Sequence, residues 1–162
     1  MKKSLRRVLP VLALCFVAFA KKEPGFTVRF YTETTSTETN TFAVPVQLQN
    51  PPRKSFISTI PNISEHDIYA IYPFQATDGT IGCVFLLDDH GKDMLDTLSI
   101  EKRGTSLIAL VNVRQVIDML IDRRIPDGIL VIPHGMTVEE GLLLKKTFKV
   151  INMPPATPPA KQ

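Results

Sequence analysis

The sequence has too few cysteines for a disulfide framework. Of its two cysteines, Cys15 lies in a hydrophobic stretch near the N-terminus and Cys83 lies in the apolar run 82–87. A single cysteine after that stretch cannot form an internal disulfide. Cys83 has no basic or histidine partner in a local motif, so we expect a small buried hydrophobic side chain rather than a nucleophile.

The motifs of common enzymes are also absent from the sequence. No serine stands in a nucleophile-elbow pattern, and no glycine-rich loop has the spacing that holds a phosphate. Gly79, Gly82 and Gly91 have the surroundings of turn or packing glycines. These absences favour a non-enzymatic protein and predict no bound cofactor.

The first twenty residues have the pattern of an export signal. A basic leader precedes an apolar run of thirteen residues, 8–20, which ends on the small residues Ala18 and Ala20. This order is typical of a cleaved signal peptide, and the run is shorter than the roughly 20 residues of a membrane-spanning helix. We expect cleavage after Ala20 and export to the periplasm or beyond. An uncleaved N-terminal anchor is the alternative, whereas Leu14 before Cys15 argues against a lipoprotein signal.

The basic character of the whole chain belongs to this leader. The sequence has 19 Lys and Arg against 16 Asp and Glu, and four of the basic residues but no acidic one precede residue 21. Cleavage therefore leaves fifteen basic and sixteen acidic groups, a net charge of −1. The mature chain offers no excess of positive charge for binding nucleic acid or an anionic membrane. The leader residues are Lys2, Lys3, Arg6 and Arg7.

The rest of the chain is predicted to be one domain, 21–153, followed by a tail, 154–162. Its length supports a single hydrophobic core, and no later segment is apolar enough to cross a membrane. The tail has four prolines in nine residues, which predicts disorder.

Apolar patterns after the leader predict a sheet. Alternation predicts strands at 26–32 and 42–48, separated by a polar surface loop at 33–41, and Pro45 favours an edge position or an irregularity for the second strand. The turn signal Asp78-Gly79 predicts a hairpin of two flanking strands. Further extended segments are expected at 56–60, 67–72, 81–87, 107–111 and 129–132.

Two helices have clear start signals. Asp88 is placed to cap a helix over 89–102, which Gly104 ends, and Thr137 and Glu140 form a capping box for a helix over 138–148. The segment 115–125 carries a helical apolar periodicity. The predicted fold class is α+β, with a mixed, mainly antiparallel sheet packed against the two helices.

Four segments resemble, in order and spacing, the head of the first periplasmic domain of SecD, the membrane subunit that assists protein export. The segments are Phe85 to Lys92, Leu107 to Asn112, Gln115 to Ile117, and Gly135 to Gly141. The resemblance covers about residues 68–148. It implies an extended conformation for 115–125, against the local periodicity, and a protein-interaction module as the function.

The sequence departs from that family at three points. It has none of the membrane helices of SecD, so the resemblance does not imply a complete translocase subunit. The family's Asp-Gly turn is replaced by Asn112-Val113, and a proline expected a few residues later is missing, with Met119 and Leu120 nearby.

An acidic cluster is the best candidate for metal or acid–base chemistry. Its residues are Asp88, Asp89 and His90, with Asp93 and Asp96 beyond, while His66, Asp67 and His134 are the other titratable candidates. Consecutive helical residues point in different directions, which favours a capping role for the cluster instead. An exported metal-dependent hydrolase that uses Asp88, Asp89, His90 and His134 remains an alternative function.

Two surfaces could contact a protein partner. Arg123 and Arg124 could offer paired guanidiniums to an acidic partner, although a surface loop of mixed charge explains them as well. The strands that contain 26–31 and 69–74 could receive an extended chain by strand addition if they lie at a sheet edge. We expect a protein-binding module, with a structural role in an envelope assembly as a further alternative.

Overall fold

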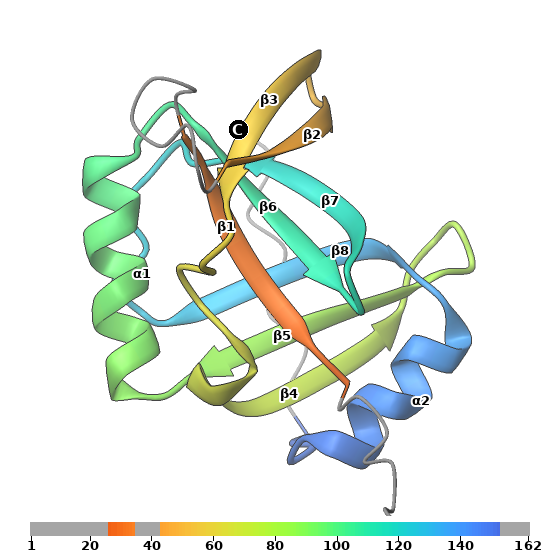
Figure 1. Cartoon of the computed structure of the whole chain (residues 1–162). Helices are drawn as coiled ribbons and strands as arrows, with labels where there is room; N and C mark the ends of the chain where they lie inside the picture. Colours follow the sequence, from red (N-terminus) through yellow and green to blue (C-terminus); the bar gives the residue numbers. More distant parts are fainter. Residues whose placement is uncertain (1–25, 35–42, 153–162) are drawn as a thin grey trace, which may run out of the picture.

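The computed structural model describes residues 26–34 and 43–152, which form eight strands and two α-helices (Figure 1). The α+β class is thereby confirmed. The leader, most of the predicted surface loop and the tail 154–162 lie outside the described residues. The strands are β1 Val28–Thr34, β2 Ala43–Gln49, β3 Pro52–Ser58, β4 Ile68–Gln75, β5 Ile81–Leu87, β6 Ser106–Val111, β7 Arg114–Leu120 and β8 Ile129–Met136; the helices are α1 Asp89–Glu101 and α2 Val138–Thr147, with a 3-10 turn, η1, at Glu65–Asp67.

The strands form two sheets rather than the one mixed sheet that the sequence predicted. The larger sheet has the order β2-β3-β1-β6-β7 and the smaller one β4-β5-β8, and every pair of neighbouring strands is antiparallel. Among the described residues, the one parallel bridge joins Ile71 of β4 to Val150, which lies outside the named strands. Hairpins connect three of the six pairs, namely β2–β3, β4–β5 and β6–β7, whereas the other three pairs join strands that are not consecutive in the chain.

The main core lies between the two sheets. Phe30 of β1 and Phe85 of β5 are both fully buried, and their rings meet edge to face with centroids 5.7 Å apart. Side chains alternate along β1, so Tyr31 lies in a second, smaller cluster with Leu48 and Ile57 under the β2–β3 hairpin. The larger sheet therefore has apolar contacts on both faces.

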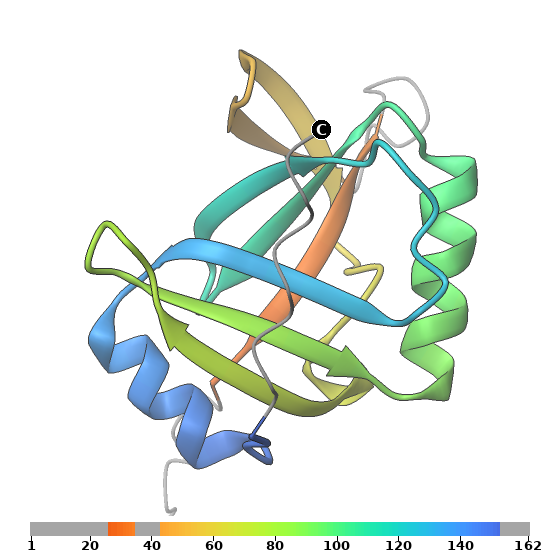
Figure 2. The ribbon, with the colours of Figure 1, turned by 180° about the vertical axis from the view of Figure 1, so that it is seen from behind.

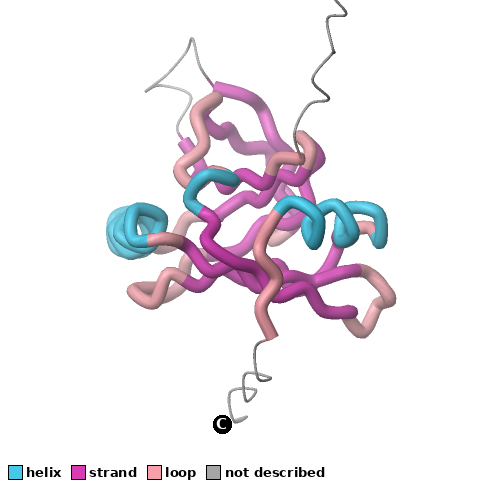
Figure 3. The backbone as a smooth tube through the Cα atoms, turned by 90° about the horizontal axis from the view of Figure 1, so that it is seen from below, coloured by secondary structure: helices cyan, strands magenta, loops and turns pink. Residues whose placement is uncertain are grey.

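The two helices lie at opposite sides of the strands (Figure 3). Asp88 accepts a hydrogen bond from the Gly91 amide at the start of α1, and Leu95 and Leu98 of that helix are buried. At the start of α2, Thr137 and Glu140 exchange the hydrogen bonds of a capping box. None of the helices within 26–34 and 43–152 has the length and hydropathy of a transmembrane segment.

The segment 115–125 is extended as far as residue 120, where β7 ends. Asn112 and Val113 both have positive φ, 47° and 70°, and they fold β7 directly back onto β6. Two left-handed residues in succession are typical of a type I′ hairpin turn. The tight turn and the ladder to β6 outweigh the helical periodicity of the segment.

Candidate peptide-binding edges of the two sheets

Strand addition requires an edge strand with unpaired backbone groups, and β1 does not provide one. β1 lies between β3 and β6 in the larger sheet. Where β3 does not reach, the Phe30 amide donates to the Ile63 carbonyl at 2.8 Å and its carbonyl accepts from the Asn62 amide at 2.9 Å. The strand over 26–31 therefore does not meet the condition for strand addition, which was a position at a sheet edge. β4, which contains 69–74, does lie at an edge, as do β2, β7 and β8.

The two edges of the larger sheet are joined to each other by side chains. The Asp118 carboxylate, on β7 and only 3% exposed, accepts the amides of Gln49 and Asn50 at 3.0 and 2.9 Å. The Gln115 side chain donates to the Gln47 carbonyl at 2.9 Å. β2 and β7 thus approach each other although no backbone ladder connects them. The sequence alone did not identify Asp118 as a residue that joins two strands. Its one distinguishing feature in the sequence is that it is an acidic residue between apolar neighbours in a strand.

Prolines limit three of the four edges. Pro45, Pro73 and Pro133 stand in β2, β4 and β8, and none of them has an amide to donate to an added strand. The edge position that Pro45 predicted for its strand is confirmed. β7 carries no proline, and its edge is the one closed by Asp118.

The first half of β8 has an open edge. The Leu87 amide donates to the Gly128 carbonyl, so in this antiparallel register Leu130 and Ile132 also face β5. The backbone of Ile129 and Val131 consequently points away from β5. The Ile129 amide is taken by the Asp127 side chain at 3.1 Å. Within the described residues, the Val131 amide and carbonyl are not paired with another strand, and the residue is 40% exposed.

A cleft of about 540 Å³ lies beside this open edge. β7 and the loop that follows it form one wall, and the start of β8 forms the other; Figure 2 shows these two strands side by side from behind. The apolar lining residues are Leu107, Met119, Leu120, Ile121, Ile125, Ile129, Leu130 and Val131. The volume falls in the range of small-ligand sites, about 300–1,000 Å³. The site combines backbone groups for a ladder with an apolar surface for side chains.

Charged residues surround the cleft, but they do not form a free arginine pair. Arg124 makes a bidentate ion pair with Asp96 of α1, at 2.6 and 2.7 Å, and this hydrogen bonding lowers the pKa of Asp96. The Ile125 amide donates to the Ser99 hydroxyl of α1 at 2.9 Å. Both contacts fix the loop between β7 and β8 to α1. Arg123 is exposed at the rim and has no ion-pair partner among residues 26–34 and 43–152.

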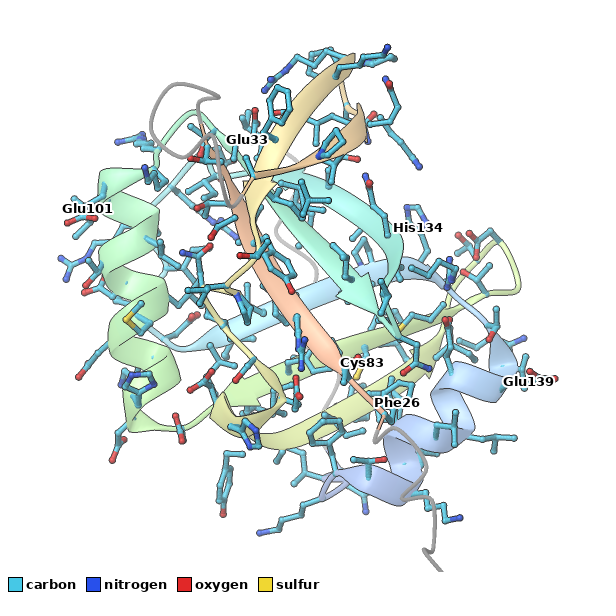
Figure 4. All side chains as sticks on the ribbon, viewed as in Figure 1. Phe26, Glu33, Cys83, Glu101, His134 and Glu139 are labelled. Carbon is cyan, nitrogen blue, oxygen red and sulfur yellow. The ribbon has the colours of Figure 1, made fainter. Side chains whose placement is uncertain are left out.

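The acidic cluster converges on a different set of residues from the one that the sequence suggested. Oxygen and nitrogen atoms of Asp67, Asp88 and His90 all lie within 4.8 Å of one another. Asp89 is not part of this group, and His134 lies on the far side of the molecule from α1, 3.7 Å from Asp78 (Figure 4). The four-residue hydrolase site is therefore not assembled.

The members of the Asp67 cluster already have structural partners. Burial alone would raise the pKa of Asp67, but hydrogen bonds from Ser64 and His90 outweigh it and hold the pKa below its usual value. Asp67 accepts the Ser64 amide and pairs with the His90 ring at 2.9 Å. Asp88 in turn caps α1. The hydrogen bonds of Asp67 and Asp88 together stabilise the junction of η1, β5 and α1.

Cys83 is buried in the central strand of the smaller sheet (Figure 4). Burial raises the pKa of its thiol to about 12. The thiol is therefore protonated at neutral pH, and a protonated thiol is a poor nucleophile.

Together, the two sheets and the helices define an α+β domain that has an edge strand beside an apolar cleft. The solved structures with a similar fold include two of SecDF. One is described as "Structure and function of a membrane component SecDF that enhances protein export", with a TM-score of 0.51 and 13% identity, covering 76% of this chain and 63% of that chain. The other, "Crystal structure of SecDF in Super-membrane-facing form", has a TM-score of 0.51 and 14% identity over 76% of this chain and 19% of that chain.

At this identity the similarity establishes the fold alone. The chain spans less than two thirds of either structure that it resembles. The sequence matches no protein-family model and no curated protein sequence. The SecD-like fold, which the order of motifs suggested, is supported by the structural similarity.

Proposed function

We propose that this chain is an exported, non-enzymatic module that binds a protein segment in extended conformation, and that it acts on proteins in the export pathway. The observation that carries the proposal is the open edge of β8 beside an apolar cleft. The resemblance to SecDF, described as enhancing protein export, supports the choice of partner.

The geometry favours an extended peptide over a small molecule. A peptide strand beside β8 gains hydrogen bonds to the outward backbone groups of Val131 and to the Ile129 carbonyl. Because side chains of a strand alternate, every second residue of the peptide faces the cleft. Apolar side chains fit the lining of the cleft, and the exposed Arg123 at its rim favours an acidic residue at one end of the segment.

A proline substitution on the open edge tests this proposal. Val131→Pro removes the outward amide but no bond to β5, and Pro133 already occupies an equivalent position on the same strand. Peptides selected from a displayed random decapeptide library are measured by calorimetry against both proteins. We expect the variant to lose at least about tenfold in affinity, since it loses one ladder hydrogen bond and gains a steric block.

The matched control is Val131→Thr, which keeps the outward amide and a β-branched side chain at the same position of β8. This variant is expected to bind the selected peptides like the unaltered chain. The proposal fails if selected peptides bind Val131→Pro and the unaltered chain equally, or if their amide chemical-shift changes avoid β8.

A metal-binding role for the Asp67 cluster is the competing proposal, because three ligand atoms converge there. Titration of the protein with zinc chloride, monitored by calorimetry, distinguishes the metal-binding proposal from the peptide-binding proposal. Stoichiometric binding that His90→Ala abolishes would favour a metal function, whereas the absence of binding heat leaves the structural role of Asp67 and Asp88.

A further inference from the structure

The edge of β4 is covered at one residue by the chain's own C-terminal segment. The Ile71 amide donates to the Lys149 carbonyl at 2.9 Å, and the Ile151 amide donates to the Ile71 carbonyl at 3.0 Å. Residues 149–151, here called the strap, therefore pair with β4 in parallel. The protein thus contains an example of strand addition to this edge, made by its own chain.

The strap is short because β4 cannot extend the ladder. Both backbone groups of Ile71 point outward, and by alternation so do those of Pro73 and Gln75. The next hydrogen bond of a parallel ladder would come from the amide of residue 73, and proline has none. Two backbone hydrogen bonds are all that the described strap makes with β4.

The side chains of the strap are held weakly. The Lys149 ammonium lies 5.0 Å from the centre of the Tyr69 ring and 3.2 Å from its hydroxyl oxygen. Tyr69 is 61% exposed and Val150 is 44% exposed, so solvent reaches this contact from outside. Apolar anchoring comes from Phe148, which packs against the main core just before the strap begins.

A groove continues along β4 in the direction in which the strap points. The strap is parallel to β4, so a longer chain in the same register would pass Pro73 and Gln75. These residues line a groove of about 350 Å³ between the end of β4 and α2. Val138 and Leu142 of α2 are exposed along this groove, with Lys145 beside them. The strap residues 149–151 are not among those that line the groove.

We propose that the edge of β4 is a second docking site, for an extended protein segment that carries a cation followed by two β-branched residues and, after one further residue, an apolar residue. The first three positions replace the strap at Tyr69 and Ile71, and the apolar residue enters the groove beside Leu142. The strap is the intramolecular competitor of this segment, and its release opens the site. The site is separate from the β8 edge and does not depend on binding there.

Competition between the strap and an added peptide lowers the affinity that is measured for the peptide. A segment tethered next to its site competes at a millimolar effective concentration, so the unaltered chain binds an added peptide weakly. A change that weakens the strap without altering β4 removes this competitor. Affinity for the added peptide then rises although the docking surface is unchanged.

The test uses the peptide Thr-Phe-Lys-Val-Ile-Asn-Leu with blocked ends and the full chain. Ile151→Pro removes the strap's donor to Ile71, and Asn152→Pro is the matched control, since no hydrogen bond to β4 comes from the Asn152 amide. We expect the peptide to bind Ile151→Pro about tenfold tighter than the unaltered chain or the control. Amide chemical shifts of Tyr69 and Ile71 should change in the complex.

A second variant covers the case in which Ile151→Pro does not fold. Lys149→Ala removes the contact with Tyr69 from the strap alone, and the peptide should bind it about twofold to fivefold tighter. Equal affinities for the unaltered chain and the strap variants would overturn the proposal, as would shift changes at Val131 instead of Ile71. Dimerisation of Ile151→Pro without peptide binding, measured by light scattering, would overturn it in favour of strap exchange between copies.

Discussion

The two sheets differ in how their edges are protected. The larger sheet brings its outer strands together and joins them through the buried carboxylate of Asp118. Within the described residues, the smaller sheet leaves β8 open beside a cleft, and only the strap pairs with the outer edge of β4. One sheet is therefore closed by contacts between its own edge strands, whereas the other is the sheet to which we propose that an additional strand binds. The difference places the candidate binding surfaces on the smaller sheet.

The largest expected effect follows from removing the link between β2 and β7. Asp118→Ala deletes a buried carboxylate that holds two amides, and hydrogen bonds to charged groups contribute about 1.5–3 kcal/mol each. Because water can reach the exposed Gln49 and Asn50, we expect a loss of about 3 kcal/mol in the free energy of unfolding, measured with urea. Hydrogen exchange should accelerate in β2 more than in β5.

The control for this change is Gln115→Ala, which removes the second, exposed contact between the same strands. It should cost under about 1 kcal/mol. If the two variants lose similar stability, Asp118 does not close the larger sheet.

The next effect concerns the central strand of the smaller sheet. A Cβ added at Gly82 would stand 2.5 Å from the Phe74 ring and 2.5 Å from the Pro133 carbonyl oxygen. The carbonyl belongs to the backbone of β8 and cannot rotate away. Gly82→Ala should therefore cost about 2 kcal/mol in urea unfolding, within the range of overpacked cores. An unchanged stability would show that β8 shifts easily against β5.

The β6–β7 turn is expected to respond in the opposite direction. Val113 is β-branched, exposed and held at a φ of 70°, where glycine is favoured. Val113→Gly should stabilise the protein by about 1 kcal/mol through relief of this strain. Thermal unfolding followed by circular dichroism checks the sign, with Gly79→Val as the reverse change at a turn glycine of φ 83°.

The smallest effect is a dependence of stability on acid. Burial alone would raise the pKa of Glu33, but hydrogen bonds from Ser106, Arg53 and Ser55 outweigh it and lower the pKa below its usual 4.5. The carboxylate then contributes stability above about pH 4.5, which is lost as the pH falls through the folded-state pKa. In Glu33→Gln the free energy of unfolding should fall less steeply between about pH 5 and pH 3. Parallel curves for the two proteins would contradict this role of Glu33.

Local signals in the sequence predicted the elements well. The capping box of α2 and the Asp78-Gly79 turn depend on residues three or fewer positions apart, and Gly79 adopts the positive φ that such a turn requires. The start of α1 at Asp88 is equally local. These features follow from the conformational preferences of short segments.

The arrangement of those elements was not predictable in the same way. The division into two sheets, the closure by Asp118 and the strap on Ile71 all join segments far apart in the chain; Asp118 and Gln49 are 69 residues apart. No local pattern marks such pairs. The interior position of β1 was not predictable for the same reason, since the segment at Asn62 and Ile63 that covers Phe30 has no strand signature. The open edge of β8 became visible only once the neighbours of each strand were known.

Cys83 makes the comparison of the two sheets measurable without any label. It is the only cysteine after residue 20, and its buried thiol lies in the main core between the two sheets, so it reacts only when that core opens. Its rate of modification by a thiol reagent therefore reports the opening of the main core, whereas separation of β2 from β7 opens the smaller cluster of Tyr31, Leu48 and Ile57. The native chain carries its own probe for deciding which of its two hydrophobic clusters opens first.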